Sequence, residues 1–357
     1  MRGLLCVILS AVVLVAVVTG CGGARHYDDR LVAADSLMHD RPDSALALVE
    51  AVSADSLAGD GDRAYRDLLL TQARYRCYVP ATSDSAINRA LAYYLAHDGE
   101  REKLTRAYIY KGAVMEELSL PDSAMLYYKH AEATAAPDDY FNLGYVNLKI
   151  AALYGDYYTM GGKEIMKYEE ALDYYKHTDD TFYLMICLNN LGCHYRETRP
   201  DTAELLLMQA SKIARQLNDT AYIITSNLAL MILYKYNQRY DEAYQMIHEV
   251  MAFNKPILDY SLCFTASCVY SKLGILDTAE LFINVAQKNK TGDDALYKLH
   301  LLGALRDFAY ASKDTLKALR LDQQYQHISD SLDANEVKIK ILDIDEAHDK
   351  EMLNQTE

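Results

Sequence analysis

The chain has 357 residues, of which 51% are hydrophobic and 24% charged, so it can bury a core and is not expected to be disordered. Only 16 residues are Gly and 6 are Pro, which argues against turn-rich all-β folds, collagen-like repeats and Pro-rich linkers. The formal net charge of −15 disfavours partners that require a basic footprint, such as nucleic acid or an anionic membrane surface.

The first twenty residues have the pattern of a targeting segment. Arg2 is their only charged residue, and the apolar run over 4–18 is shorter than the roughly 20 residues that a spanning helix needs. The run leads into Val18-Thr19-Gly20-Cys21, which resembles the bacterial lipobox, where small residues precede an invariant Cys. The resemblance implies a signal peptide over 1–20, lipidation of Cys21 after cleavage, and a lipidated tether over 21–26, because several acyl chains anchor a protein firmly.

The alternative for this segment is an ordinary signal peptide with a coincidental Cys. No Asp and no acidic run directly follow Cys21. By resemblance to bacterial lipoproteins, we expect the chain to be lipid-anchored in the cell envelope, at the outer membrane and facing the periplasm.

From residue 27 to 330 one short phrase recurs, in which Asp, a small or polar residue and Ala open an apolar helix. The clear copies are Asp43-Ser44-Ala45, Asp84-Ser85-Ala86, Asp122-Ser123-Ala124, Asp201-Thr202-Ala203, Asp241-Glu242-Ala243 and Asp277-Thr278-Ala279, with degenerate copies at Glu169-Glu170-Ala171 and Thr315–Ala318. Successive Ala lie 32 to 47 residues apart, about 39 on average. The Asp can cap a helix and suits its positive end, and a Pro precedes three of them. Helices are therefore predicted to begin near residues 43, 84, 122, 169, 201, 241, 277 and 314.

A second kind of helix precedes each phrase and carries small residues and a Tyr. Gly inside a helix costs about 1 kcal/mol relative to Ala, so its presence indicates that a partner helix crosses there. The pattern resembles the tetratricopeptide repeat (TPR), most clearly at Gly192, Tyr195, Ala203, Leu207 and Ala210, although the signature Trp is absent and the repeat is longer than about 34 residues. The resemblance implies an all-α, right-handed superhelical solenoid of about eight antiparallel helix pairs over 27–330, in a lipoprotein of the Bacteroidota type.

Two segments interrupt or end this pattern. The longest interval contains 155–162, where we expect a loop tip because Gly is frequent there. After residue 320 a helical pattern continues through Leu321, Ile328 and Leu342, and 331–357 is predicted to be an acidic C-terminal helix or tail. This last helix either caps the final repeat or forms a short coiled coil.

The sequence contains almost no motif of catalytic chemistry. No two His are close enough for a zinc-binding helix motif, and no nucleophile elbow, P-loop or dinucleotide fingerprint follows the signal segment. Cys193 and His194 are adjacent in a helical pattern, so their side chains diverge. The five Cys that remain after Cys21 form an odd set, which indicates buried small hydrophobic residues rather than a disulfide framework. We expect no enzyme, no cofactor and no metal.

The candidate binding surface is the concave side, which the first helices of each pair line in TPR arrays. The residues assigned to it are Asn147, Asn189, Asn190, Arg196, Asn227 and Lys235. A row of Asn can hold an extended peptide backbone, and the two cations can meet a carboxylate. The alternative is that these are inter-helix or solvated polar residues. The Lys/Asn/Lys/Arg set with which some TPR proteins bind a terminal carboxylate is not reproduced.

The chain also has 30 Tyr, 6 Phe and no Trp, and several Tyr are adjacent in sequence. Because neighbours in a helix point about 100° apart, one member of each pair is expected to face away from the core. The surplus Tyr are either ordinary core and surface residues or contacts for a partner.

The predicted function is a membrane-tethered, non-catalytic scaffold that binds a protein or peptide in its concave groove. One alternative is a periplasmic sensor module, because the repeats resemble those of Bacteroidota regulators. A second is a glycan-binding outer-membrane lipoprotein, which the lack of Trp disfavours. The sequence does not indicate the oligomeric state.

Overall fold

A computed structural model describes residues 26–157, 162–253, 260–288 and 295–334, and within these ranges the chain is all-α without a strand. The predicted signal peptide, the Cys21 lipidation site and nearly all of the predicted tail lie outside the described residues. Within the described ranges, no helix is sufficiently long and apolar to cross a bilayer.

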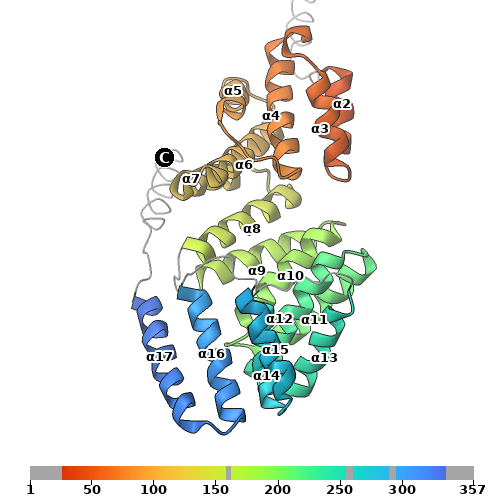
Figure 1. The fold of residues 1–357 in the computed structure, drawn as a ribbon. Helices are drawn as coiled ribbons and strands as arrows, with labels where there is room; N and C mark the ends of the chain where they lie inside the picture. Colours follow the sequence, from red (N-terminus) through yellow and green to blue (C-terminus); the bar gives the residue numbers. More distant parts are fainter. Residues whose placement is uncertain (1–25, 158–161, 254–259, 289–294, 335–357) are drawn as a thin grey trace, which may run out of the picture. The chain divides into compact units, whose positions relative to one another are not determined.

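The described helices form eight consecutive pairs (Figure 1). The first helices of the pairs are α2 (Asp29–Leu37), α4 (Asp60–Arg76), α6 (Arg101–Glu117), α8 (Tyr140–Tyr157), α10 (Thr181–Tyr195), α12 (Thr220–Tyr236), α14 (Tyr260–Lys272) and α16 (Ala295–Ala311). The second helices are α3 (Pro42–Ala51), α5 (Ser85–Leu95), α7 (Pro121–Thr134), α9 (Lys163–Tyr175), α11 (Pro200–Gln216), α13 (Tyr240–Met251), α15 (Leu276–Lys288) and α17 (Thr315–Ala334). A short 3₁₀ turn at Ala54–Ser56 separates α3 from α4. The predicted all-α solenoid of helix pairs is therefore confirmed.

The chain divides into two compact units after Asp98, a division that the sequence pattern did not indicate. The first unit contains α2 to α5, and its core includes Leu31, Val49 and Leu69. The second unit contains α6 to α17, with a continuous core that runs from Leu148 to Ala304.

Seven of the eight second helices begin within one residue of the predicted position. The prediction for α9 was wrong, because the helix begins at Lys163, six residues before the expected start at 169. Gly162 precedes it with a left-handed backbone (φ +92°), which ends the turn and lets the helix start there. The expected loop tip is shorter at its other end as well, because α8 continues to Tyr157.

The recurring Asp does not generally cap the second helices. Asp43, Asp122 and Asp201 lie within the first helical turn, after Pro, and the residues at the N-cap make no side-chain capping bond. These carboxylates therefore act only through the positive end of the helix dipole. Asp caps occur on first helices, where Asp180 accepts from the Tyr183 amide at 2.9 Å and Asp219 from the Tyr222 amide at 3.1 Å. Among the second helices, α17 has such a cap, because Asp314 accepts from the Lys317 amide at 3.1 Å.

Non-glycine residues form most of the tight turns inside the pairs, which explains the low Gly content. Ser119, Gln238 and Lys313 have left-handed φ values of 60°, 58° and 64° where Gly274 occupies the same place in another pair. After Gln238, the Arg239 amide donates to the Tyr234 carbonyl at 2.8 Å and thereby satisfies the end of α12.

Gly lies where two helices cross closely, as the sequence predicted. A Cβ on Gly112 would come within 2.5 Å of the Tyr128 ring, and one on Gly192 within 2.7 Å of Leu207 Cγ. Gly144, which the repeat pattern did not single out, approaches the ring of Tyr175 in the same way. Each of these first helices therefore packs directly against the aromatic or branched side chain of the helix that follows it.

The adjacent Tyr divide as expected. Tyr94, Tyr128 and Tyr175 are buried, whereas their preceding neighbours Tyr93, Tyr127 and Tyr174 are half-buried. For the pair at 157 and 158, the second member lies outside the described residues. Among the described residues, many Tyr are buried in the core, most others are half-buried, and few are exposed enough to contact a partner.

Candidate functional site

Three of the four predicted Asn are buried between helices instead of forming an exposed ladder. Asn147 is 0% exposed and its amide donates to the Leu143 carbonyl at 2.9 Å. Asn227, 1% exposed, accepts from Ser211 at 3.1 Å and donates to Glu249 at 2.9 Å. Asn189 is 5% exposed, and only Asn190 is half-buried. These placements favour the inter-helix interpretation for the buried three and leave their role in partner binding a prediction.

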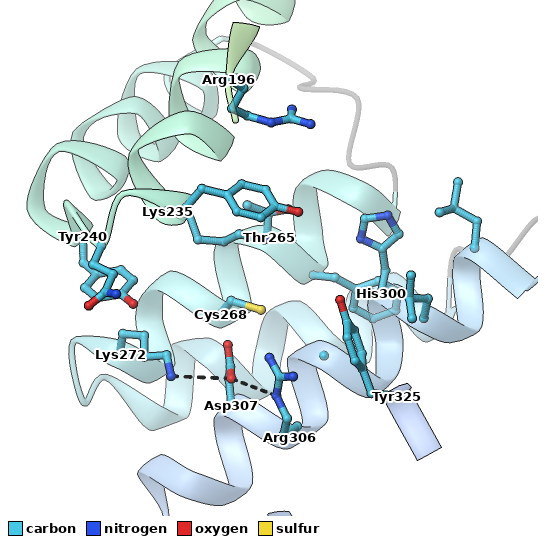
Figure 2. Close-up of a pocket in the computed structure, with 16 residues that line it drawn as sticks. Arg196, Lys235, Tyr240, Thr265, Cys268, Lys272, His300, Arg306, Asp307 and Tyr325 are labelled. Atoms are coloured by element: carbon cyan, nitrogen blue, oxygen red, sulfur yellow. Dashed lines mark hydrogen bonds and ion pairs between the residues drawn. The ribbon is translucent and has the colours of Figure 1, made fainter. Parts of the chain in front are cut away.

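Arg196 and Lys235, in contrast, line one pocket of about 520 Å³ in the second unit (Figure 2). Its walls come from the first helices α12, α14 and α16, from Arg196 after α10, and from Tyr325 on α17. First helices thus supply most of the pocket lining. This volume lies in the size range of small-ligand sites and is large enough for a few amino-acid side chains.

The pocket is cationic although the chain as a whole is acidic. Its lining contains Arg196, Lys235, Lys272 and Arg306 but only one carboxylate, Asp307. Such a concentration of positive charge in a concave site raises the local concentration of anions.

At one end of the pocket, two cations lie beside an exposed aromatic ring. Lys235 Nζ is 5.0 Å and Arg196 Cζ 5.3 Å from the centre of the Tyr236 ring, which is 55% exposed. Neither cation has a carboxylate within ion-pair distance among the described residues, and the buried Nε of Arg196 has no hydrogen-bond partner there. Figure 2 shows the Arg196 guanidinium pointing toward the cavity. This end can therefore accept an anion without first breaking an ion pair.

At the other end, the charges are already paired. Asp307 Oδ1 lies 3.5 Å from Lys272 Nζ and 3.3 Å from Arg306 Nε (Figure 2). Arg306 also lies 3.1 Å from a carboxylate oxygen of Asp322. Burial would lower the pKa of Arg306, but the charges of Asp307 and Asp322 and the hydrogen bonds to them raise it above its ordinary value. This end is a nearly neutral, fixed boundary of the pocket.

The pocket chemistry does not point to catalysis. Cys268, a potential nucleophile in the lining, is buried, and burial raises the pKa of its thiol to about 12. The thiolate that attacks substrates is therefore scarce at neutral pH. Outside the pocket lining, burial likewise lowers the pKa of the His194 imidazole and raises the pKa of the adjacent Cys193 thiol. Among the described residues, no three His, Cys, Asp or Glu side chains are placed to hold a metal.

Sequence reasoning missed several lining residues, although one periodic signal was present. A basic residue follows the core Tyr at the end of three successive first helices: Arg196 after Tyr195, Lys235 after Tyr234, and Lys272 two residues after Tyr270. Repeats placed in register bring Arg196 and Lys235 onto one face, and Lys272 lies one position further along its helix. Tyr236 and Tyr325 carry no comparable signal, because Tyr occurs throughout the chain.

Comparison with known proteins identifies the fold but no family. No family model matches the chain, and no curated protein matches its sequence. Among solved structures, the apo form of RapI superimposes with a TM-score of 0.64 at 13% identity, covering 87% of this chain and 99% of that one. A Rap protein complexed with competence and sporulation factor gives 0.57 at 16% identity, covering 86% and 98%. At these identities the likeness shows a TPR-like helical-repeat fold alone.

Proposed function

We propose that this protein is a non-catalytic scaffold that binds a peptide or a peptide segment of a protein on the concave face of its second unit. The observation that carries the proposal is the pocket lined by Arg196, Lys235 and Tyr236, where two cations without a carboxylate partner among the described residues lie beside an exposed aromatic ring. Exposed Tyr and Arg are the side chains that most often anchor protein contacts. The Rap structure solved in complex with competence and sporulation factor supports ligand binding by such a fold.

We further propose that the scaffold is tethered to the outer membrane by lipid on Cys21 and faces the periplasm. The Val18–Cys21 pattern supports this placement. In cells supplied with an alkyne-labelled fatty acid, the full chain should incorporate label and partition into detergent, and Cys21→Ala should do neither. Label retained on the Cys21→Ala chain would contradict the assignment.

Site-specific photo-crosslinking in cells tests the binding face. A photoreactive residue at position 236 lies in the pocket, whereas one at Leu205, 62% exposed on α11, lies outside its lining and is the matched control. We expect one reproducible protein or peptide adduct from position 236 and none from position 205. Equal adducts from both positions, or none from 236, would refute a partner-binding pocket.

A further inference from the structure

The two ends of the pocket differ in how far their charges are already satisfied. Asp307 holds Lys272 and Arg306, so that end offers little net attraction to an added anion. Arg196 and Lys235 have no such carboxylate among the described residues, and both contact the ring of Tyr236, at 5.3 Å and 5.0 Å from its centre. Two cations without a counter-charge leave this end of the pocket positively charged, and a bound carboxylate would supply the missing negative charge.

We propose that the Arg196–Lys235 end of the pocket binds a carboxylate side chain of an acidic peptide segment. This rests on the proposed function and specifies the chemistry of its ligand. The guanidinium can donate two parallel hydrogen bonds to the carboxylate, and the ammonium adds a second positive charge at the same end of the pocket. The exposed ring of Tyr236 covers the neighbouring apolar part of the peptide.

An acidic segment can come from a separate partner or from this chain. Residues 343–351 contain five acidic residues and one Lys, and they follow α17, whose Tyr325 lines the pocket. From Tyr325 to Ala334 the helix advances about 13.5 Å, and the eight residues 335–342 can span roughly 26 Å when extended. The chain is therefore long enough for 343–351 to return to the pocket, where tethering would give it a high effective concentration.

A fluorescent synthetic copy of residues 342–351 serves as the probe, and a copy with Asn or Gln in place of its five acids serves as the neutral control. We expect the full chain to bind the acidic copy at least about tenfold more tightly than the neutral one, with an affinity that falls as salt is added. Arg196→Gln and Lys235→Gln should each weaken binding about fivefold or more. Lys212→Gln is the matched control, because Lys212 is exposed on α11 outside the pocket lining, and it should change binding less than about twofold.

The two sources are separated by neutralising the same five acids within the full chain. Tighter probe binding to this variant than to the unmodified chain supports the site and assigns its resting occupant to the chain's own segment. Equal binding supports the site and assigns its carboxylate to a separate partner. Thermal melts of the Gln variants check that the fold is retained, and the salt dependence of the unmodified chain tests the charge contribution independently of any variant.

The carboxylate site is overturned if both copies bind equally, if neither binds even to the neutralised chain, or if Lys212→Gln weakens binding as much as Lys235→Gln. Failure of the carboxylate site can be distinguished from failure of the proposed peptide-binding function. A reproducible adduct at position 236 combined with no preference for the acidic copy would leave a peptide-binding scaffold whose ligand is not acidic.

Discussion

The substitution Gly192→Ala tests how closely α10 and α11 cross. The added Cβ would lie 2.7 Å from Leu207 Cγ, 2.9 Å from Leu207 Cδ2 and 3.3 Å from the Ala203 carbonyl oxygen. Carbon atoms in contact are about 3.5–4.0 Å apart, so Leu207 would have to move by about 1 Å. Leu207 is fully buried, so close-packed neighbours oppose a change of its rotamer and we expect the helices to separate.

The magnitude follows from two opposing effects. Overpacking a core costs about 1–3 kcal/mol, whereas replacing Gly by Ala in a helix gains up to about 1 kcal/mol. We therefore expect a net loss of about 1–2 kcal/mol. Gly155→Ala is the matched control, since its Cβ would meet nothing closer than His194 Cε1 at 4.0 Å. There the helix propensity acts alone and the expected change is a gain of up to about 1 kcal/mol.

Urea unfolding of the two variants and the unmodified chain, followed by far-UV circular dichroism, measures the difference. Arrays of repeats need not unfold in two states, so the transition midpoints are compared instead of extrapolated free energies. The Gly192→Ala midpoint should fall and the Gly155→Ala midpoint should stay level or rise. If Gly192→Ala raises the midpoint as much as Gly155→Ala does, the close crossing of α10 and α11 is refuted.

Three further outcomes follow from individual contacts. Asp219→Ala should cost about 1 kcal/mol in the same urea assay because it removes a helix cap, whereas Asp201→Ala, which only loses a dipole interaction, should cost a few tenths. The hydrogen bond from Arg239 lowers the pKa of Glu204, so this stabilisation is complete above the unfolded-state pKa of 4.5 and is lost as pH falls through the lower folded-state value. Arg239→Gln should therefore flatten the acid side of the stability profile, and an unchanged profile would count against the pair. Burial raises the pKa of the Cys268 thiol to about 12, so Cys268 should resist iodoacetamide in the native chain at mildly alkaline pH. It should react after unfolding in urea, and mass spectrometry measures both reactions. Rapid alkylation of the native chain would contradict the burial of Cys268.

The sequence predicted the helix pairs well because the signals that begin a helix are local. Pro fixes the backbone for the first helical turn and Asp interacts with the helix dipole, so both mark a boundary without knowledge of the tertiary structure. The start of α9 escaped prediction because Gly162 determines it through a turn, and the degenerate phrase at 169–171 lies inside the helix. The division after Asp98 depends on which helices pack together, which no local pattern expresses.

The burial of two of the predicted Asn could have been inferred from their position in the helix relative to a core Tyr. Asn147 and Asn227 each precede a core Tyr by seven residues, and seven residues are close to two helical turns. A residue two turns from a buried Tyr shares its face, so burial of both Asn follows from the burial of Tyr154 and Tyr234. Arg196 and Lys235 follow a core Tyr by one residue, which turns them about 100° away from the core.

Stability and binding make opposite demands on the cations of the pocket. A cation that stabilises a fold acquires a nearby carboxylate, as Arg239 does with Glu204 at 2.6 Å and Arg306 with Asp322 at 3.1 Å. Arg196 and Lys235 have no such carboxylate among the described residues, so neutralising either breaks no ion pair and should weaken the fold little. Residues that a fold does not require, held together in a concave site, are what a ligand-binding role explains and a structural role does not. A variant there that binds less while melting no lower would separate the two roles in a single protein.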